Sequence, residues 1–347
     1  MNTNHRFDHS LLPLGKLPHE QLADLLDRYA PHDPSILVGP RLGEDATAID
    51  LGQGFGDRLL VAKTDPITFA TDEIGWYAVN VNANDVACMG ARPRWFLSTL
   101  LLPGGRTDRA LVEDIFEQIG RACAALGVSL AGGHTEITYG LDRPIVVGHM
   151  LGEVARDRLV TTGGAQVGDV LILTKGIAVE ATAIIAREKA DELAGRFSAG
   201  FVARCQNFLH DPGISIVRDA QVAVAAGRVH AMHDPTEGGL ATGLWELAWA
   251  AGVGLEITAS ALPILPETAQ LCQAFDLDVL GVIASGALLM AVLPGDAPAI
   301  RQVLEAEGIP ACEIGRVVEK TAGVSLLTAK GRQPLPRFAR DEIARLF

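Results

Sequence analysis

Three aspartates stand beside apolar segments in the first quarter of the chain. Asp45 follows a glycine in "GEDATAID", Asp65 ends the apolar run "DRLLVAKTD", and Asp85 lies within "NVNANDVA". Charged side chains are rarely buried unless they are paired or bind a metal. Neighbouring carboxylates tolerate one another when a divalent cation lies between them, and Mg²⁺ prefers oxygen ligands of this kind. A surface turn explains any one of these aspartates, whereas the three together predict a cation site.

The stretch "AGGHTEI" joins the glycine pair Gly132 and Gly133 to His134, Thr135 and Glu136. Glycine has no side chain, so its backbone can approach a phosphate closely. His134 has the residue type of an acid, a base or a ligand, and a hydrogen-bonded structural histidine is an equally good interpretation. We expect a strand here that runs into a Gly-Gly turn.

The stretch "MHDPTEGGL" is a stronger candidate for a phosphate site. Asp234 precedes a proline, Thr236 is of an N-cap residue type, and Gly238 and Gly239 fall in the first turn of a predicted helix. Glycines at this place leave the first N–H groups of the helix open to an anion. The alternative is a capped helix whose glycines allow close packing, but glycine is costly inside a helix and a pair of them calls for a reason.

Two further residues accompany the first three aspartates. Lys63 precedes Asp65 by two positions and carries the charge needed to neutralise a phosphate, although a surface lysine at a strand end is the alternative. Asn84 is next to Asp85 in a helical segment that is unusually rich in asparagine, a poor helix former. Both residues therefore join the list of candidates.

The elements that position these candidate residues are strands and helices that alternate along the chain. Strands are predicted at the two ends of the segment 57–103, with a helix over 72–89 that begins at the N-cap Asp72 and ends at Gly90. The composition becomes turn-rich over 154–168, where we place a domain boundary, so that residues 1–155 and 156–347 form two domains. Alternation in both halves predicts a mixed α+β (α/β) fold.

The composition excludes several kinds of protein. Hydrophobic residues make up 48% of the 347 residues and charged residues 20%, as in ordinary globular proteins. The net charge of −13, from 29 basic and 42 acidic residues, argues against nucleic acid or an anionic membrane as a partner. Glycine, serine and proline interrupt the longest apolar run, 279–295, which predicts a turn and a buried strand rather than a membrane span. The first ten residues contain no apolar signal region and the five cysteines form no C-x-x-C pair, so a cytoplasmic protein is expected.

Five motifs in sequence order, "GEDATAI", "KTDP", "NDVACMGARP", "AGGHTE" and "HDPTEGGL", resemble the aminoimidazole-ribonucleotide synthetase (PurM-like) superfamily. The resemblance implies an N-terminal sheet domain that forms a homodimer, a C-terminal α/β domain, and ATP with Mg²⁺ in the cleft. It also implies that Asp45, Asp65, Asp85 and Asp234 are the metal ligands. The full set of candidates for nucleotide binding is Lys63, Asp65, Asn84, Asp85, Gly132, Gly133, Thr135, Asp234, Thr236, Gly238 and Gly239, with His134 and Glu136 as catalytic candidates.

The motifs are most similar to the HypE-like branch of this superfamily, with three departures. Ala339 stands where the tail of that branch has a carrier cysteine, Glu136 stands at a lysine position, and Ser285 at a glutamate position. Alanine cannot act as a nucleophile. The resemblance therefore implies a Mg·ATP-binding enzyme that phosphorylates or activates an oxygen of a small molecule. The alternatives are a hydrogenase maturation factor of the HypE type and a non-catalytic nucleotide- or partner-binding dimer. Deleting the tail after Arg337 is expected to leave Mg·ATP binding largely intact, because the proposed ligands end at Gly239.

Overall fold

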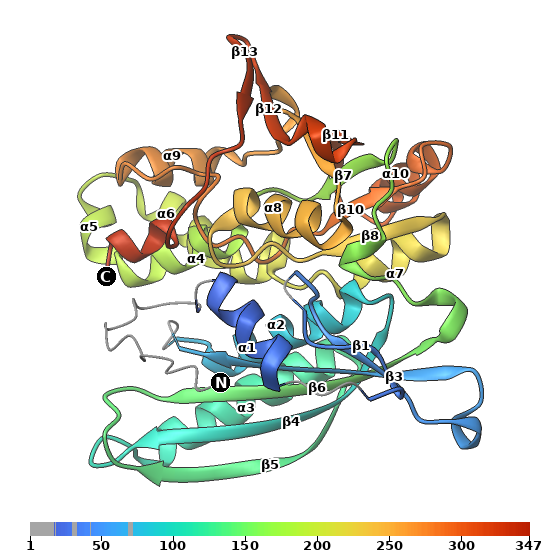
Figure 1. Cartoon of the computed structure of the whole chain (residues 1–347). Helices are drawn as coiled ribbons and strands as arrows, with labels where there is room; N and C mark the ends of the chain where they lie inside the picture. The colour runs from blue at the N-terminus through green and yellow to red at the C-terminus, as the bar shows by residue number, and fades with distance from the viewer. Residues whose placement is uncertain (1–16, 18, 30–32, 42, 69–71) are drawn as a thin grey trace, which may run out of the picture.

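The computed structural model describes residues 17, 19–29, 33–41, 43–68 and 72–347. Two sheets, each from one half of the chain, lie with helices between and around them (Figure 1). The first ten residues, on which the absence of a signal region was argued, lie outside the described residues. The elements of the first half are α1 (His19–Tyr29), β1 (Ile36–Val38), β2 (Thr47–Asp50), β3 (Arg58–Ile67), α2 (Ile74–Cys88), β4 (Arg92–Pro103), α3 (Arg109–Leu126), β5 (Ser129–Thr138) and β6 (Ile145–Ala155).

The first sheet has the strand order β1-β2-β3-β6-β4-β5. All its neighbouring strands are antiparallel except β4 and β5, which α3 connects in parallel. Along β6 the residues alternate between buried and half-buried, as a strand does when one face is covered. Helices α2 and α3 cover that face, and Figure 1 shows none of the described helices on the other face of β4 and β5.

The second sheet has the order β13-β12-β9-β11-β7-β10-β8, and only its β9 and β12 are parallel neighbours. The elements of the second half of the chain are β7 (Val170–Thr174), α4 (Val179–Glu188), α5 (Ala190–Ala194), α6 (Ala199–Asn207), α7 (Val217–Ala226), β8 (Val229–His233), α8 (Gly239–Ala251), β9 (Gly254–Thr258), α9 (Pro266–Ala274), β10 (Leu289–Val292), α10 (Ala297–Ala306), β11 (Ala311–Val318), β12 (Val324–Thr328) and β13 (Gly331–Pro334). The mixed α and β fold predicted from the sequence is confirmed.

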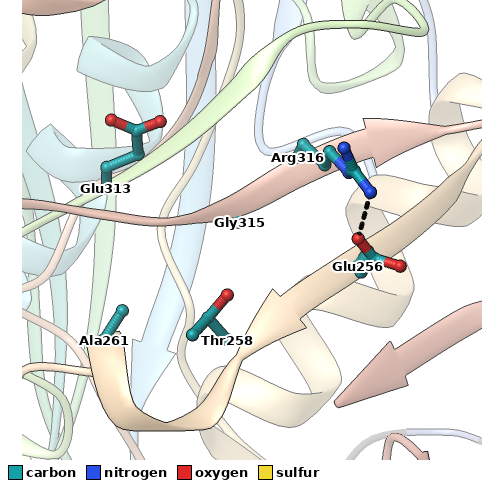
Figure 2. Close-up of a pocket in the computed structure, with 6 residues that line it drawn as sticks. All are labelled: Glu256, Thr258, Ala261, Glu313, Gly315 and Arg316. Carbon is teal, nitrogen blue, oxygen red and sulfur yellow. Dashed lines mark hydrogen bonds and ion pairs between the residues drawn. The ribbon is translucent and has the colours of Figure 1, made fainter. Parts of the chain in front are cut away.

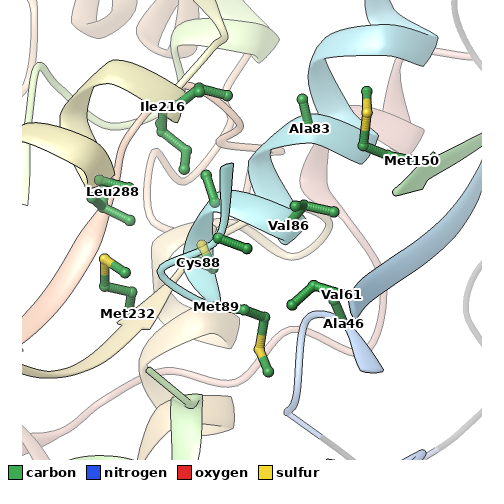
Figure 3. Close-up of a cluster of buried hydrophobic side chains, with 14 of the residues drawn as sticks. Ala46, Val61, Ala83, Val86, Cys88, Met89, Met150, Ile216, Met232 and Leu288 are labelled. Carbon is green, nitrogen blue, oxygen red and sulfur yellow. The ribbon is translucent and has the colours of Figure 1, made fainter. Parts of the chain in front are cut away.

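Helix α2 is buried between the two sheets. Figure 3 shows its side chains Val86 and Cys88 surrounded by Val61 of the first sheet and by Met232 and Leu288 of the second half. Such a helix has apolar or small residues all round rather than one apolar face. Each polar residue of α2 must therefore find a partner inside the protein, and these partners shape the candidate site.

Three local expectations are corrected. Helix α2 begins at Ile74 rather than after Asp72, and its N-cap Glu73 has a left-handed backbone (φ 57°) and no side-chain cap; Asp72 instead pairs with Arg187. The glycine pair 132–133 does not turn the chain but lies within the continuous strand β5. At the start of α8 the Gly238 N–H, which was expected to be open to an anion, already has a partner within the chain, as described below.

The apolar run 279–295 contains a turn and the buried strand β10, as expected. No helix in the described part of the chain is long and apolar enough to cross a membrane.

Candidate functional site

Lys63 lies between two of the predicted aspartates, Asp65 and Asp85. It is on β3 two residues before Asp65, so both side chains point from the strand toward α2, which carries Asp85. The Lys63 ammonium lies 3.2 Å from Asp65 Oδ2 and 3.2 Å from Asp85 Oδ2. The structure thus brings together a strand-end pair and a helical aspartate from different motifs, and Lys63 is not a free surface lysine.

The charges in this cluster act strongly on one another. Burial alone would lower the pKa of Lys63, but the charges of Asp85, Asp65 and Asp45 raise it above its usual range. Burial raises the pKa of Asp85 well above its usual range; Lys63 opposes this rise, and the nearby carboxylates of Asp65, Asp45 and Asp234 add to it. The four predicted aspartates therefore lie close enough for their charges to interact.

Asp45 is held by a histidine that the sequence interpretation missed. His233 Nδ1 lies 2.7 Å from Asp45 Oδ1, and His233 Nε2 lies 3.0 Å from Glu246 Oε2. Burial alone would lower the pKa of His233, but the charge of Asp45, followed by that of Glu246, raises it well above its usual range. A protonated His233 thus bridges two carboxylates. The adjacent Glu44 accepts hydrogen bonds from the backbone N–H groups of residues 162 and 163.

Asp234 has the least satisfied side chain of the four aspartates. Only 2% of the residue is exposed, and neither of its carboxyl oxygens has a hydrogen bond of good geometry. Burial, then the charge of Asp45, raises its pKa well above the usual range, while the neighbouring Asn84 side chain acts in the opposite direction. A buried carboxylate without a partner is costly, so this position calls for a proton or a cation.

The asparagines of α2 connect the two halves of the chain. Asn82 Oδ1 accepts the Asp65 backbone N–H at 2.8 Å, which fixes the end of β3. Asn84 donates to the Ile214 carbonyl at 2.8 Å and accepts the Ile216 N–H at 2.9 Å. The Asn84 amide is thereby engaged by the second half of the chain, so its role in nucleotide binding stays a prediction.

The glycine pair before α8 has a structural reason. Gly238 and Gly239 have φ of 78° and 67°, and a Cβ on Gly239 would lie 2.5 Å from the Leu280 carbonyl oxygen. The Gly238 N–H donates to Asp341 Oδ2 at 2.7 Å, so this donor is filled by the C-terminal segment rather than open to an anion. The segment after Arg337 therefore contacts one of the candidate residues, and the expectation that its deletion leaves Mg·ATP binding intact stays a prediction.

The residues of β5 do not join the aspartates within one chain. In the sheet register Asp65 pairs with Gly148, Gly148 with Ser98, and Ser98 with Gly133. Three strand spacings separate Asp65 from Gly133, which is about 14 Å. His134 Nε2 lies 3.4 Å from Glu136 Oε2, and both side chains are more than half exposed. Their catalytic role, and the roles of Gly132 and Thr135 on the same strand, stay predictions.

The donor set fits a divalent cation that is shared with a ligand. In the parts of the chain described above, no three His, Cys, Asp or Glu side chains stand ready to hold a metal ion by themselves. Mg²⁺ is commonly bound by one or two carboxylates together with the phosphates of a substrate, and it does not need a complete protein cage. The two unbonded oxygens of Asp234 provide such a partial set.

A hollow of about 450 Å³ lies elsewhere, on β9 and β11 of the second sheet. Figure 2 shows Arg316 and Glu256 joined across it, and Arg332 pairs with the same Glu256. Glu256 is thus satisfied by two arginines, whereas Glu313, which also lines the hollow, is exposed to solvent. It therefore offers less to a ligand than the buried carboxylates around α2.

Comparison with known proteins identifies the family. Residues 43–154 match the N-terminal domain, and residues 166–327 the C-terminal domain, of AIR synthase related proteins. The chain belongs to the AIR synthase related family. This AIR synthase related protein is 33% identical over 271 residues to the carbamoyl dehydratase HypE of Rhodobacter capsulatus, covering 77% of this chain and 76% of that one. It is 31% identical over 264 residues to the selenide, water dikinase of Paraburkholderia xenovorans, covering 73% and 68%.

A solved structure of the hydrogenase maturation protein HypE in complex with ATP has the same fold. It superimposes with a TM-score of 0.70 at 24% identity, over 93% of the AIR synthase related chain and 91% of its own. The PurM-like assignment made from the five motifs is therefore confirmed. These relatives are enzymes with different substrates, so the family does not fix the reaction.

Proposed function

We propose that this protein is an enzyme that binds Mg·ATP between its two sheets and uses it to phosphorylate, or otherwise activate, an oxygen of a small molecule. The observation that carries the proposal is the convergence of four acidic side chains around Lys63 and α2, with both oxygens of the buried Asp234 unbonded. The HypE protein of the same fold was solved in complex with ATP, which supports the same ligand here.

Each residue has a role that follows from its contacts. Asp234 and Asp85 would hold Mg²⁺, which neutralises phosphate charge when it is bound. Asp65, whose side chain is 36% exposed, is the aspartate nearest to solvent. Its carboxylate can bind a metal cation in place of the Lys63 ammonium. Lys63 can then turn its ammonium to a phosphate. His233 holds Asp45 in a fixed orientation. Phosphoryl transfer depends mainly on such positioning and charge neutralisation.

Carbamoyl dehydration of the HypE type is the second candidate, favoured by the 33% identical relative. The position matched to the carrier cysteine is Ala339, and the residues around it anchor the C-terminal segment to the second half of the chain. Asp341 is bonded to Gly238, and Arg337 lies 3.9 Å over the Trp245 ring. A fixed segment without a thiol favours the small-molecule reaction. ADP release measured with candidate acceptors, and a mass increase of one carbamoyl group, separate the two functions.

The test of the proposed function is stabilisation by nucleotide. ATP is expected to raise the melting temperature only when Mg²⁺ is present, because a ligand that binds the native state stabilises it by mass action. Thermal unfolding is followed with ATP and Mg²⁺, with ATP in excess EDTA, and with Mg²⁺ alone. Equal stabilisation by ATP in EDTA would show that the carboxylates do not bind a cation.

A homodimer joined through the first sheet is expected, and β5 supports it. Every residue of this edge strand from Ser129 to Ile137 is exposed, including Leu130 at 43% and Ile137 at 60%. An exposed apolar edge strand is a template for pairing with another chain. In such a dimer His134 and Glu136 lie next to the partner. Light scattering should give about 73 kDa, twice the 36.7 kDa of one chain.

A lysine on the edge strand should interfere with this pairing. Leu130→Lys is expected to shift the protein toward the monomer at micromolar concentration. Leu51→Lys is the matched control, since Leu51 is exposed to a similar extent (41%) but follows β2. A wild-type mass of one chain at all concentrations, or dissociation by both substitutions alike, would contradict a dimer through β5.

A further inference from the structure

Seven buried side-chain atoms in the described residues lack a hydrogen bond of good geometry. All lie on α2, at the start of α4, or at the end of β8, where the two halves of the chain meet. They are Trp76 Nε1, Tyr77 Oη, Asp85 Oδ2, Glu180 Oε2, His233 Nδ1 and both carboxyl oxygens of Asp234. Asp85 Oδ2 and His233 Nδ1 lie within ion-pair distance of Lys63 and Asp45, so the unpaired atoms are the other five. Native proteins leave few such atoms, so their concentration along one seam indicates that the seam takes a ligand.

The seven atoms divide into two groups. Asp85, His233 and Asp234 belong to the candidate cation site described above. Tyr77 is eight residues before Asp85 on α2, which places it about 12 Å farther along the helix axis. Glu180 connects the two ends, because its neighbours Val179 and Ala181 pack in one buried cluster with Tyr77. The segment that leads to Ser285 joins α4 to the loop after Asp234: the Ala181 N–H donates to the Ile283 carbonyl, and the Ala284 N–H donates to the Thr236 carbonyl, both at 3.3 Å. The second group, Trp76, Tyr77 and Glu180, therefore extends the seam beyond the cation site.

Glu180 is not explained by packing alone. It lies in the first turn of α4, only 5% of the residue is exposed, and its neighbours along the helix are apolar or small. Hydrogen bonds from Ser285 to its carboxyl oppose the effect of burial, yet Oε2 stays without a bond of good geometry. The carboxylates of Asp341 and Glu237 are the charged groups that act on it most.

Two cations of the described residues that act on the seam, Arg187 on Tyr77 and Lys175 on Asp234, are already paired. Arg187, whose charge acts on Tyr77, forms an ion pair with Asp72. Lys175 lies 3.5 Å from Asp219 Oδ2 and donates to the carbonyl of Ser215 at 2.6 Å. The Glu180 end is thus acidic, and a phosphate or carboxylate group there would be repelled.

We propose that Glu180, Tyr77 and Ser285 form a subsite for the second substrate, which rests on the proposed function and places the acceptor beside the cation site. The subsite binds an uncharged or cationic molecule that carries N–H or O–H groups. Glu180 Oε2 accepts a hydrogen bond from the molecule, and the Tyr77 hydroxyl donates one to it. An anionic acceptor is excluded by the carboxylates of Asp341, Glu237 and Asp234.

The test uses two probes of nearly the same shape, trifluoroacetamide and trifluoroacetate, whose ¹⁹F signals broaden on binding to the full-length protein. We expect the amide to broaden and the carboxylate to stay sharp. Glu180→Leu should reduce the amide broadening at least fivefold, and Tyr77→Phe should reduce it less. Glu188→Leu is the matched control, an exposed glutamate at the end of the same helix. Broadening of the carboxylate, no broadening of the amide, or an unchanged signal in Glu180→Leu would overturn the subsite.

The same experiment separates this inference from the proposed function. Asp234→Asn removes a predicted cation ligand. It should leave the broadening of the amide signal unchanged, because Asp234 is not one of the three residues of the proposed subsite. Glu180→Leu should in turn keep the stabilisation by Mg·ATP. If wild-type protein binds the amide through Glu180 but is not stabilised by Mg·ATP, the proposed function fails and the subsite stands. If wild-type protein is stabilised by Mg·ATP but does not bind the amide through Glu180, the subsite fails and the proposed function stands.

Discussion

Replacing Asp234 with asparagine is expected to abolish stabilisation by Mg·ATP without lowering the melting temperature of the protein in EDTA. The two results have one cause. Asp234 is buried, and both its carboxyl oxygens lack a hydrogen bond of good geometry, so the side chain contributes little to the metal-free fold. A cation bound to these oxygens depends on the charge that the substitution removes. We expect the dissociation constant of Mg·ATP, measured by calorimetry, to rise at least tenfold.

Asp50→Asn provides the matched control. Asp50 lies on β2, five residues after Asp45, and pairs with Arg156. Its loss should leave Mg·ATP binding within twofold of the wild-type value. A structural role for Asp234 would instead lower the melting temperature in EDTA and leave nucleotide binding to the remaining folded protein unchanged. That result would show that Asp234, at the end of β8, is not a ligand of the cation.

Sequence patterns predicted the aspartates better than their partners. Asp65 closes the apolar run of β3, two residues before the strand ends, and Asp85 lies in a polar stretch of a small-residue helix. Both positions are visible from local composition. The bridge from Asp45 to His233 is not visible, because it joins residues from opposite halves of the chain. The only signal was that His233 immediately precedes Asp234 in "HDP". Long-range ion pairs of this kind depend on the packing of α2 between the sheets.

Glycine was the least reliable guide. The pair 132–133 predicted a turn, but β5 continues through it, because the ladder with β4 supplies the hydrogen bonds and glycine weakens a strand only modestly. The pair 238–239 predicted an anion site, and its reasons are the close contact with Leu280 and the bond to Asp341. Neither contact can be read from neighbouring residues. Glu180 was the opposite case, since a single carboxylate within "IAVEATAII" was a visible signal that the interpretation overlooked.

Replacing Glu180 with glutamine is expected to flatten the dependence of stability on pH. Burial, opposed by Ser285 and aided by Asp341, raises the pKa of Glu180 in the folded protein to about 7 from the usual 4.5. Between pH 4.5 and 7 the folded protein holds a proton that the unfolded chain has released, so the free energy of unfolding falls as the pH rises. The loss is complete above about pH 7. A shift of this size corresponds to a difference on the order of 3 kcal/mol.

Chemical denaturation at about pH 5 and about pH 8, on either side of the Glu180 titration, measures the effect. Wild type should lose stability between these values, and Glu180→Gln should lose less and become the more stable protein at the higher pH. Part of the slope will remain, because burial also raises the pKa of Asp341, to about 6. Glu188→Gln should keep the wild-type slope, since Glu188 is exposed. Equal slopes for wild type and Glu180→Gln would show that Glu180 is stably ionised in the fold. If Glu180→Gln gains stability at the higher pH, as expected, and also loses binding of trifluoroacetamide, the carboxylate is retained for function at a cost in stability.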